Sequence, residues 1–263
     1  MQRIKFFSLL VTGIFLSFSC YSLQHDTNTT DRSFDVSAEG VWSTKAKFKD
    51  NGIKDQKIRF GSSSGKLSLV QPIGEDNAFL LDVGYTNVYL DWKENPSFSE
   101  QNHPLMNIMI GGRSTGLEKW VWTGAVITDV HAEKLNFADN ARYKGSMLGR
   151  YEYSDEVGVY VGLFGSTGLH KKEIFPIFGV DYAPSSAWKI HVIFPMKLSA
   201  EYFLTENKQW SLSAEGRSFK TRHRLGRKEL LSKGIFEYRS YGGDLALNYT
   251  LDMVTAKAFA GMK

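Results

Sequence analysis

A two-residue alternation of apolar and polar side chains constrains this chain most, and it recurs in nearly every segment from residue 34 to residue 260. From Phe34 to Phe48 the even positions are mostly apolar or small, whereas the odd positions are mostly charged or hydroxyl-bearing. From Ala141 to Tyr153, tyrosines, glycines and a methionine alternate with charged residues and serine. Such alternation predicts β-strands with one apolar and one polar face. Segments of ~10 residues of this kind, separated by turns, are typical of transmembrane β-barrels.

The segmentation predicts an all-β protein, an antiparallel up-and-down transmembrane β-barrel of about 12 to 14 strands. The upper number requires a turn at Gly242-Gly243 that splits the segment 235–250, and the lower number leaves a partial thirteenth strand at the end of the chain. The strands are expected near residues 34–48, 57–71, 78–90, 104–112, 119–131, 141–153, 157–165, 174–183, 188–194, 197–204, 209–219, 235–250 and 254–260.

The connections between these segments alternate in length along the chain. Outer-membrane barrels combine short periplasmic turns with longer outer loops, so this alternation favours the same architecture. Pro195-Met196 is an exception, because this short connection falls where a long loop is due. The long connections are 91–103, 132–140 and 220–234, and the short ones include 74–77, 154–156 and 205–208.

The tryptophans lie mainly at predicted strand ends. An amphipathic indole prefers the interface between membrane and water, so aromatic residues at both ends of spanning strands form two girdles. Only Trp42 falls inside a predicted strand, and the others that mark ends are Trp92, Trp120, Trp122, Trp188 and Trp210.

Alternation alone leaves open which face points inward, because a water-soluble barrel places its apolar face inside. Strands this long and this numerous enclose a lumen too wide to be filled by side chains. We therefore expect lipid on the apolar face and water on the charged face. The predicted lumen-lining residues are Arg142, Lys144, Arg150, Glu152, Glu215, Arg217, Glu237 and Arg239.

The N-terminus predicts export. Arg3 and Lys5 precede an apolar run, Phe6 to Phe18, that is shorter than the ~20 residues of a spanning helix and is followed by small residues. We expect a signal peptide over residues 1–20, a flexible segment over 21–33 and the barrel over 34–263. Cys20, the sole cysteine, would then be the first mature residue. Lipid attachment there is one alternative, although Ser17 stands where lipoprotein signals usually have leucine, and disulfides are excluded.

Candidate chemistry is sparse. Gly61 to Gly65 matches the G-x-S-x-G pattern of hydrolases, but no helical pattern follows it, so a bend within a strand is the expected structure. The six histidines lack the spacing of a metal site, and we expect neither a cofactor nor a catalytic site. His191 is open to two interpretations, as the base of a lipase or as a residue of the lumen. A net charge of +4 does not demand nucleic acid as a partner.

The basic segment from Arg222 to Lys233 is expected in the longest loop. It fits the docking of lipopolysaccharide phosphates or anionic solutes at a pore mouth, and it equally fits an ordinary solvated loop. The expected partners are therefore outer-membrane lipid, lipopolysaccharide and small solutes.

The stretch from Phe175 to Trp210 reads FPIFGVDYAPSSAWKIHVIFPMKLSAEYFLTENKQW, with prolines, glycine and tryptophan separating strand, tight turn and strand. It resembles a family of uncharacterised bacterial outer-membrane β-barrel proteins. The resemblance implies a barrel in the outer membrane of a Gram-negative bacterium and brings no catalytic residue. Such barrels commonly end on an aromatic residue, whereas this chain ends Gly261-Met262-Lys263, with Phe259 as the nearest aromatic.

The expected function is therefore that of a porin-like or structural barrel with a charged lumen and no enzymatic activity. Two other classes stay open: an outer-membrane hydrolase of the lipase type, which needs Ser, His and a polar group together, and a periplasmic lipoprotein that binds lipid in a closed apolar pocket.

Overall fold

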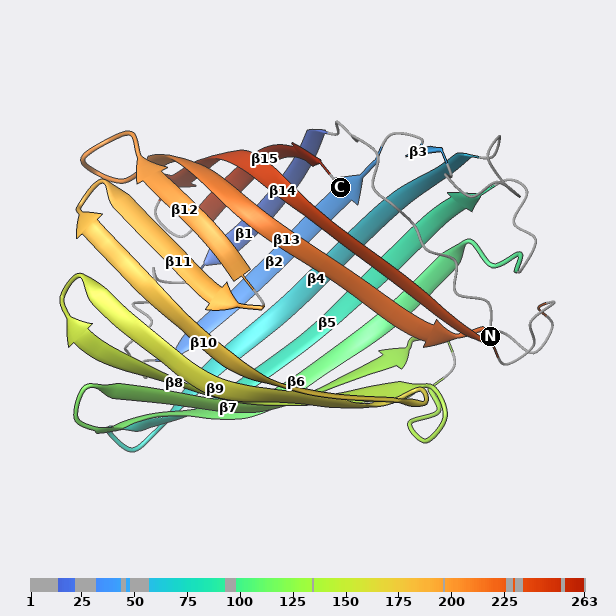
Figure 1. Cartoon of the computed structure of the whole chain (residues 1–263), viewed down its shortest axis with the longest axis horizontal. Coiled ribbons are helices and arrows are strands. Elements are labelled where there is room, and N and C mark those ends of the chain that lie inside the picture. Colours follow the sequence, from blue (N-terminus) through green and yellow to red (C-terminus); the bar gives the residue numbers. More distant parts are fainter. Residues whose placement is uncertain are drawn as a thin grey trace.

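The alternating segments form one antiparallel sheet in the computed structural model (Figure 1). The structure describes residues 14–21, 32–43, 46–47, 57–92, 98–133, 135–195, 197–225, 229, 234–251 and 254–262. All regular structure within these ranges is strand, which confirms the predicted all-β class. The strands are β1 Ile14–Tyr21, β2 Ser33–Trp42, β3 Ala46–Lys47, β4 Lys57–Ile73, β5 Asn77–Trp92, β6 Asn102–Leu117, β7 Trp120–His131, β8 Ala141–Ser154, β9 Val157–Gly168, β10 Lys171–Ser185, β11 Trp188–Phe194, β12 Lys197–Phe203, β13 Trp210–Arg224, β14 Ile235–Leu251 and β15 Val254–Met262.

The order of the strands is up-and-down, as predicted. From β4 to β15 each strand pairs with its neighbours in sequence, and fourteen of the described strands are longer than two residues. The first and the last described strands also lie side by side, because β1 pairs with both β15 and β2, and β2 pairs in turn with β4.

Two predicted boundaries are wrong. Residues 235–250 do not form a hairpin at Gly242-Gly243, because β14 runs through both glycines, which pair with Arg217 and Gly216. The predicted strand 34–48 ends at Trp42, and Ala46–Lys47 forms a separate bridge to β4. Strand pairing sets both boundaries, since buried backbone groups need hydrogen-bond partners. β13 pairs with β14 along its whole length, through both glycines, whereas the pairing of β2 with β4 ends at Trp42.

The predicted signal peptide overlaps the sheet. Residues 1–13 lie outside the described residues, but Ile14–Tyr21 form β1 in the full-length chain. Processing before Cys20, which stays a prediction, would remove nearly all of this strand.

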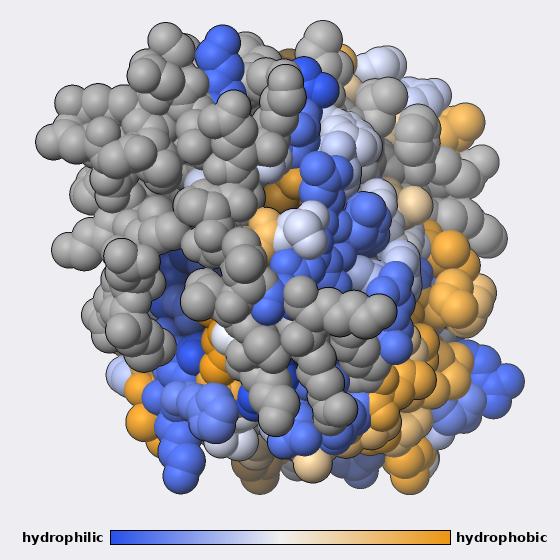
Figure 2. Space-filling model, turned by 90° about the vertical axis from the view of Figure 1, so that its right-hand side faces the viewer, coloured by the Kyte–Doolittle hydropathy of each residue, from blue (hydrophilic) through white to orange (hydrophobic). Residues whose placement is uncertain are grey.

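Each strand presents opposite chemistry on its two faces. Lys66, Asp82 and Met109 line a shared cavity, and we call their side of the curved sheet the concave face. The next residue along each strand, Leu67, Val83 or Ile110, is exposed on the opposite, convex face. Viewed into the end that carries the long connections, the molecule shows hydrophobic surface at its periphery (Figure 2). Other exposed apolar residues of the convex face are Val126, Met147, Leu163, Ile174, Leu212 and Leu245.

Aromatic residues gather at the end of the sheet that carries the short turns. Trp120 stacks on Trp122, with ring centroids 5.3 Å apart, and Trp188 packs on Tyr202 at 4.9 Å. Trp210 packs on Tyr249 at 4.5 Å. Trp92, in contrast, is 6% exposed and lies against Phe98. Among the described residues, no helix has the length and apolar character needed to cross a membrane.

Candidate functional site

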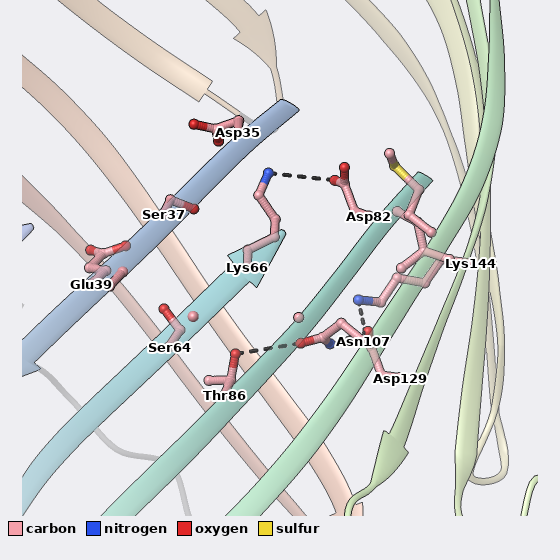
Figure 3. Close-up of a pocket in the computed structure, with 15 residues that line it drawn as sticks. Asp35, Ser37, Glu39, Ser64, Lys66, Asp82, Thr86, Asn107, Asp129 and Lys144 are labelled. Carbon is pink, nitrogen blue, oxygen red and sulfur yellow. Dashed lines mark hydrogen bonds and ion pairs between the residues drawn. The ribbon is translucent and has the colours of Figure 1, made fainter. Parts of the chain in front are cut away.

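The concave face encloses a cavity of about 470 Å³, called here the large cavity (Figure 3). Its walls come from β2, β4, β5, β6, β7 and β8, because successive strands each contribute alternate side chains to the same face. Four carboxylates and two lysines line it. They are Asp35, Glu39, Asp82, Asp129, Lys66 and Lys144.

Most charges of the large cavity are paired across neighbouring strands. Lys66 Nζ lies 3.5 Å from Asp82 Oδ2, and Lys144 pairs with Asp129. Asn107 Nδ2 donates to Asp129 at 2.7 Å. Cross-strand pairs of opposite charge each contribute up to ~1 kcal/mol, so these contacts fix side chains more than they stabilise the fold.

A second cluster surrounds Glu173 of β10. Arg142 Nη2 lies 2.9 Å from its carboxylate, Lys171 Nζ 2.6 Å and Lys220 Nζ 2.7 Å. Ser166 also receives a hydrogen bond from Arg142 at 3.0 Å. One carboxylate therefore holds three cations from three different strands.

Lys220 reaches this cluster because part of one hairpin leaves the plane of its neighbours. β12 pairs with β13 only as far as Gly216, and β11 pairs with β10 only from Phe178 onward. The short hairpin of β11 and β12, turning at Pro195, thus leaves a gap in the described sheet. We call Arg217–Arg224 together with Ile235–Gly242 the distal hairpin; on the β12 side, its β13 portion has no partner strand in the described pairings.

Both faces of the distal hairpin contact groups of the concave side. On one face, Tyr238 stacks on Phe60 of β4 at 4.8 Å, and Phe236 packs on Phe98 and His103 at 5.1 and 5.3 Å. On the other face, Lys220 contacts Glu173, as described above. A strand that stayed in the sheet would contact the interior with one face only, so the distal hairpin lies within the concavity.

Contacts with the connections hold the end of the distal hairpin. Arg224 Nε donates to the carbonyl oxygen of Asp139 at 3.1 Å, and Arg224 Nη2 lies 3.3 Å from His170 Nε2. Beyond the strand end, Glu229 accepts hydrogen bonds from Ser99. Leu225 is 5% exposed and joins the apolar cluster of Phe60, Val88, Leu90 and Phe98. The end of the distal hairpin is therefore held by polar contacts with the connections and by apolar packing.

A smaller cavity of about 120 Å³, called here the small cavity, separates the distal hairpin from β5 to β8. It shares Asp129 and Lys144 with the large cavity. Lys220 and Arg222 enter it from the hairpin, and Arg142 and Lys144 from β8. The large cavity is rich in carboxylates, whereas the small cavity is rich in cations.

A third polar cluster lies nearer the short turns. Asp181 of β10 contacts His191 Nδ1, and it accepts hydrogen bonds from Tyr160 at 2.6 Å and from Arg150 at 3.2 Å. Ser199 of β12 is the direct cross-strand partner of His191, on the same face. An aspartate, a histidine and a serine thus follow one another across three neighbouring strands.

Most of the residues predicted to line a lumen take part in polar clusters, but these clusters are separate from one another. Arg142 and Lys144 line the cavities, Arg150 pairs with Asp181 and with Glu152 at 2.9 Å, and Glu215 pairs with Lys257 at 2.9 Å. The side chain of Arg217 lies outside the described residues.

Glu237 and Arg239 reach the same region by another route. They share the face of β14 that carries the exposed Leu245 and Leu247 and would point outward if β14 stayed in the sheet. Because the distal hairpin lies in the concavity, Glu237 instead contacts Arg222 at 3.3 Å and Arg239 at 2.9 Å.

Sequence reasoning missed Lys220 as a member of the site, and it placed Arg222 in a loop, whereas Arg222 belongs to β13 and lines the small cavity. Both follow Trp210 and Leu212 in the same alternation, so they fall on a face that begins apolar and exposed. The change from apolar to cationic side chains along one face of β13 was the available signal. It marks where β13 continues beyond its pairing with β12 and enters the concavity.

The structure gives no support to two kinds of site that the sequence analysis considered, a hydrolase nucleophile and, among the described residues, a metal centre. Gly61 to Gly65 lies inside β4 and is not a strand-to-helix turn, so the hydrolase pattern has no structural support. In the part of the chain that the structure describes, no three His, Cys, Asp or Glu side chains gather as metal ligands. Of the basic segment 222–233, residues 222–225 and Glu229 are described, and they lie against the concave side.

This chain is similar to proteins of Chlamydia, a genus of Gram-negative bacteria. An uncharacterized protein of Chlamydia trachomatis serovar D is 24% identical over 82% of this chain and 72% of its own length. One of Chlamydia pneumoniae is 24% identical over 92% and 80%, and one of Chlamydia muridarum is 22% identical over 90% and 81%. No known family profile matches the chain.

Proposed function

We propose that this chain is a transmembrane β-barrel of the bacterial outer membrane, porin-like, with a charged lumen formed by the concave face. The observation that carries the proposal is the distribution of polarity, with apolar side chains exposed on the convex face and charged side chains clustered on the concave face. Ile174 and Leu245, for example, are 72% and 71% exposed. In water such a surface would be strongly unfavourable, whereas a bilayer solvates it.

The strand pairings support the same proposal. In a bilayer every backbone donor and acceptor requires a partner, so a spanning sheet must close on itself. In the full-length chain, pairing of β1 with β15 and with β2, and of β2 with β4, brings the two ends of the sheet side by side, which supports the proposed closure. Outer-membrane lipid and lipopolysaccharide are then the partners of the convex face, and small solutes are the partners of the lumen.

Detergent gels and planar bilayers test the proposal together. Purified protein should migrate faster when unboiled than when boiled, and it should form channels of discrete conductance. Absence of a mobility shift would overturn the barrel, and a shift without conductance would overturn the porin-like role. A carbonate wash of bacterial membranes should leave the protein in the pellet. Release into the supernatant would instead favour a periplasmic lipid-binding lipoprotein.

The second candidate function is hydrolysis. It is favoured by the strand register, which pairs Asp181 with His191 and His191 with Ser199. The contact with Asp181 fixes the His191 ring, as the orienting group of a catalytic triad does. Because these groups occupy the concave face, a water-soluble ester is the substrate class that reaches them. Ester hydrolysis should disappear in both Ser199→Ala and His191→Ala while Ser213→Ala retains it. Absence of activity in the unmodified protein would reject this candidate.

A further inference from the structure

Two properties of the small cavity distinguish it from the remaining concave face. The first is charge, since Arg142, Lys144, Lys220 and Arg222 line it together with a single carboxylate, Asp129. Glu173 and Glu237 contact three of these cations from the side without lining the cavity. The nearby carboxylates therefore leave an excess of positive charge around an enclosed space.

The second property is an unsatisfied donor. The side chain of Arg222 is 6% exposed, and its Nη1 atom pairs with Glu237 at 3.3 Å. Its Nε atom is buried and donates no hydrogen bond in the described structure. A buried guanidinium N–H without an acceptor costs about 1–3 kcal/mol, so an acceptor in the cavity would offset that cost.

We propose that the small cavity binds a phosphate-type oxyanion, coordinated jointly by β8 and the distal hairpin. Arginine and lysine suit such an anion, because planar guanidinium groups donate two parallel hydrogen bonds and ammonium groups add point charge. The volume of about 120 Å³ fits a small tetrahedral anion, since one water needs only ~10–15 Å³ of such space.

Binding of the anion is coupled to the position of the distal hairpin. Lys220 and Arg222 belong to the distal hairpin, whereas Arg142 and Lys144 belong to β8. The site is complete only when the hairpin lies within the concavity, so bound anion stabilises that arrangement by mass action. This inference depends on the contacts of the hairpin and not on conduction, and it can therefore fail or succeed independently of the porin-like role.

Calorimetric titration of the purified full chain in detergent tests the site, with inorganic phosphate as the probe and chloride at matched ionic strength as the reference. Phosphate should bind saturably at one site per chain. Arg222→Met and Lys220→Met should each weaken binding about tenfold or more, because each removes a charged hydrogen bond. Lys257→Met, which removes a lumen-facing cation paired with Glu215, should leave the affinity unchanged.

The heat-dependent gel shift of each variant checks that it is folded, and Lys144→Met provides a third variant if Arg222→Met does not fold. Failure of phosphate to saturate the unmodified protein would overturn the proposal, as would equal affinity in the folded variants. A parallel titration with short-chain phosphatidic acid separates free anion from lipid headgroup. Binding of the lipid without binding of inorganic phosphate would also contradict the assignment.

Discussion

Glu173 pairs with three cations, each at a short distance. Its carboxylate lies within 2.9 Å of cationic nitrogens of Arg142, Lys171 and Lys220, which come from β8, β10 and β13. These cations would repel one another without it, because like charges at such separations interact unfavourably in a partly dry interior. Glu173 therefore links the distal hairpin to the wall of the sheet.

Glu173→Gln should lower the free energy of unfolding by about 1–3 kcal/mol, since it leaves three cations without their shared counter-charge. Urea titration followed by tryptophan fluorescence measures the change. Glu206→Gln, in an exposed turn, is the matched control and should have almost no effect. Equal stability of the two variants would show that Glu173 does not anchor the hairpin.

At the scale of elements, the short β11–β12 hairpin controls the path of the longer hairpin after it. β11 and β12 stop pairing at Phe178 and Gly216, so Lys171–Ile177 has no strand neighbour on one side within the described sheet. Pro176 lies in this stretch and has no N–H to donate, as expected at a sheet edge. The β13 and β14 strands continue beyond β12, and their distal part enters the concavity.

Shortening this hairpin should open the passage through the proposed barrel. Replacing Ser218–Tyr241 by Asn-Gly places a two-residue turn next to the existing Arg217 and Gly242 pair. We expect a preserved gel shift and a larger single-channel conductance, because the distal hairpin no longer occupies the interior. Removal of residues 135–138, in another connection, serves as the control and should change conductance little. Identical conductance in both variants would exclude the distal hairpin as an obstruction.

At the scale of the whole molecule, the proposed membrane location rests on the distribution of polarity between the two faces of the sheet. Val161 and Leu163 of β9 are 42% and 50% exposed on the convex face, while Tyr160 and Ser166 of the same strand are buried on the concave face. A water-soluble β-barrel would show the reverse pattern, because its apolar residues form the core.

Leu163→Arg should therefore impair folding into lipid vesicles. Arginine at the bilayer midplane of a barrel costs about 2–4 kcal/mol, whereas the same change near an interface costs about 1 kcal/mol or less. Ser154→Arg, beside a short turn, is the control. The fraction of protein that shows the gel shift across a urea series measures both effects. A Leu163→Arg variant that folds as well as the control would mean that water, not lipid, contacts this face.

The sequence by itself determined most strands after β1 and their two faces, because side chains alternate with a period of two whatever the partner strand is. The pattern at 141–153 predicted both the extent of β8 and the common face of Arg142, Lys144 and Arg150. The sequence also predicted short connections at 74–77 and 154–156, and the structure has turns at 74–76 and 155–156. These features depend on local chemistry, which is readable along the chain.

Only the tertiary structure decided how the distal hairpin lies and which charges it brings together. Alternation assigns Lys220 and Glu237 to the same outward face as Leu212 and Leu245, yet both contact cavity-side groups. The reason is that β12 ends early, and the length of one strand relative to another is a property of the whole sheet. Strand pairing between distant segments, such as β1 with β15, is likewise set by which backbone groups remain unpaired.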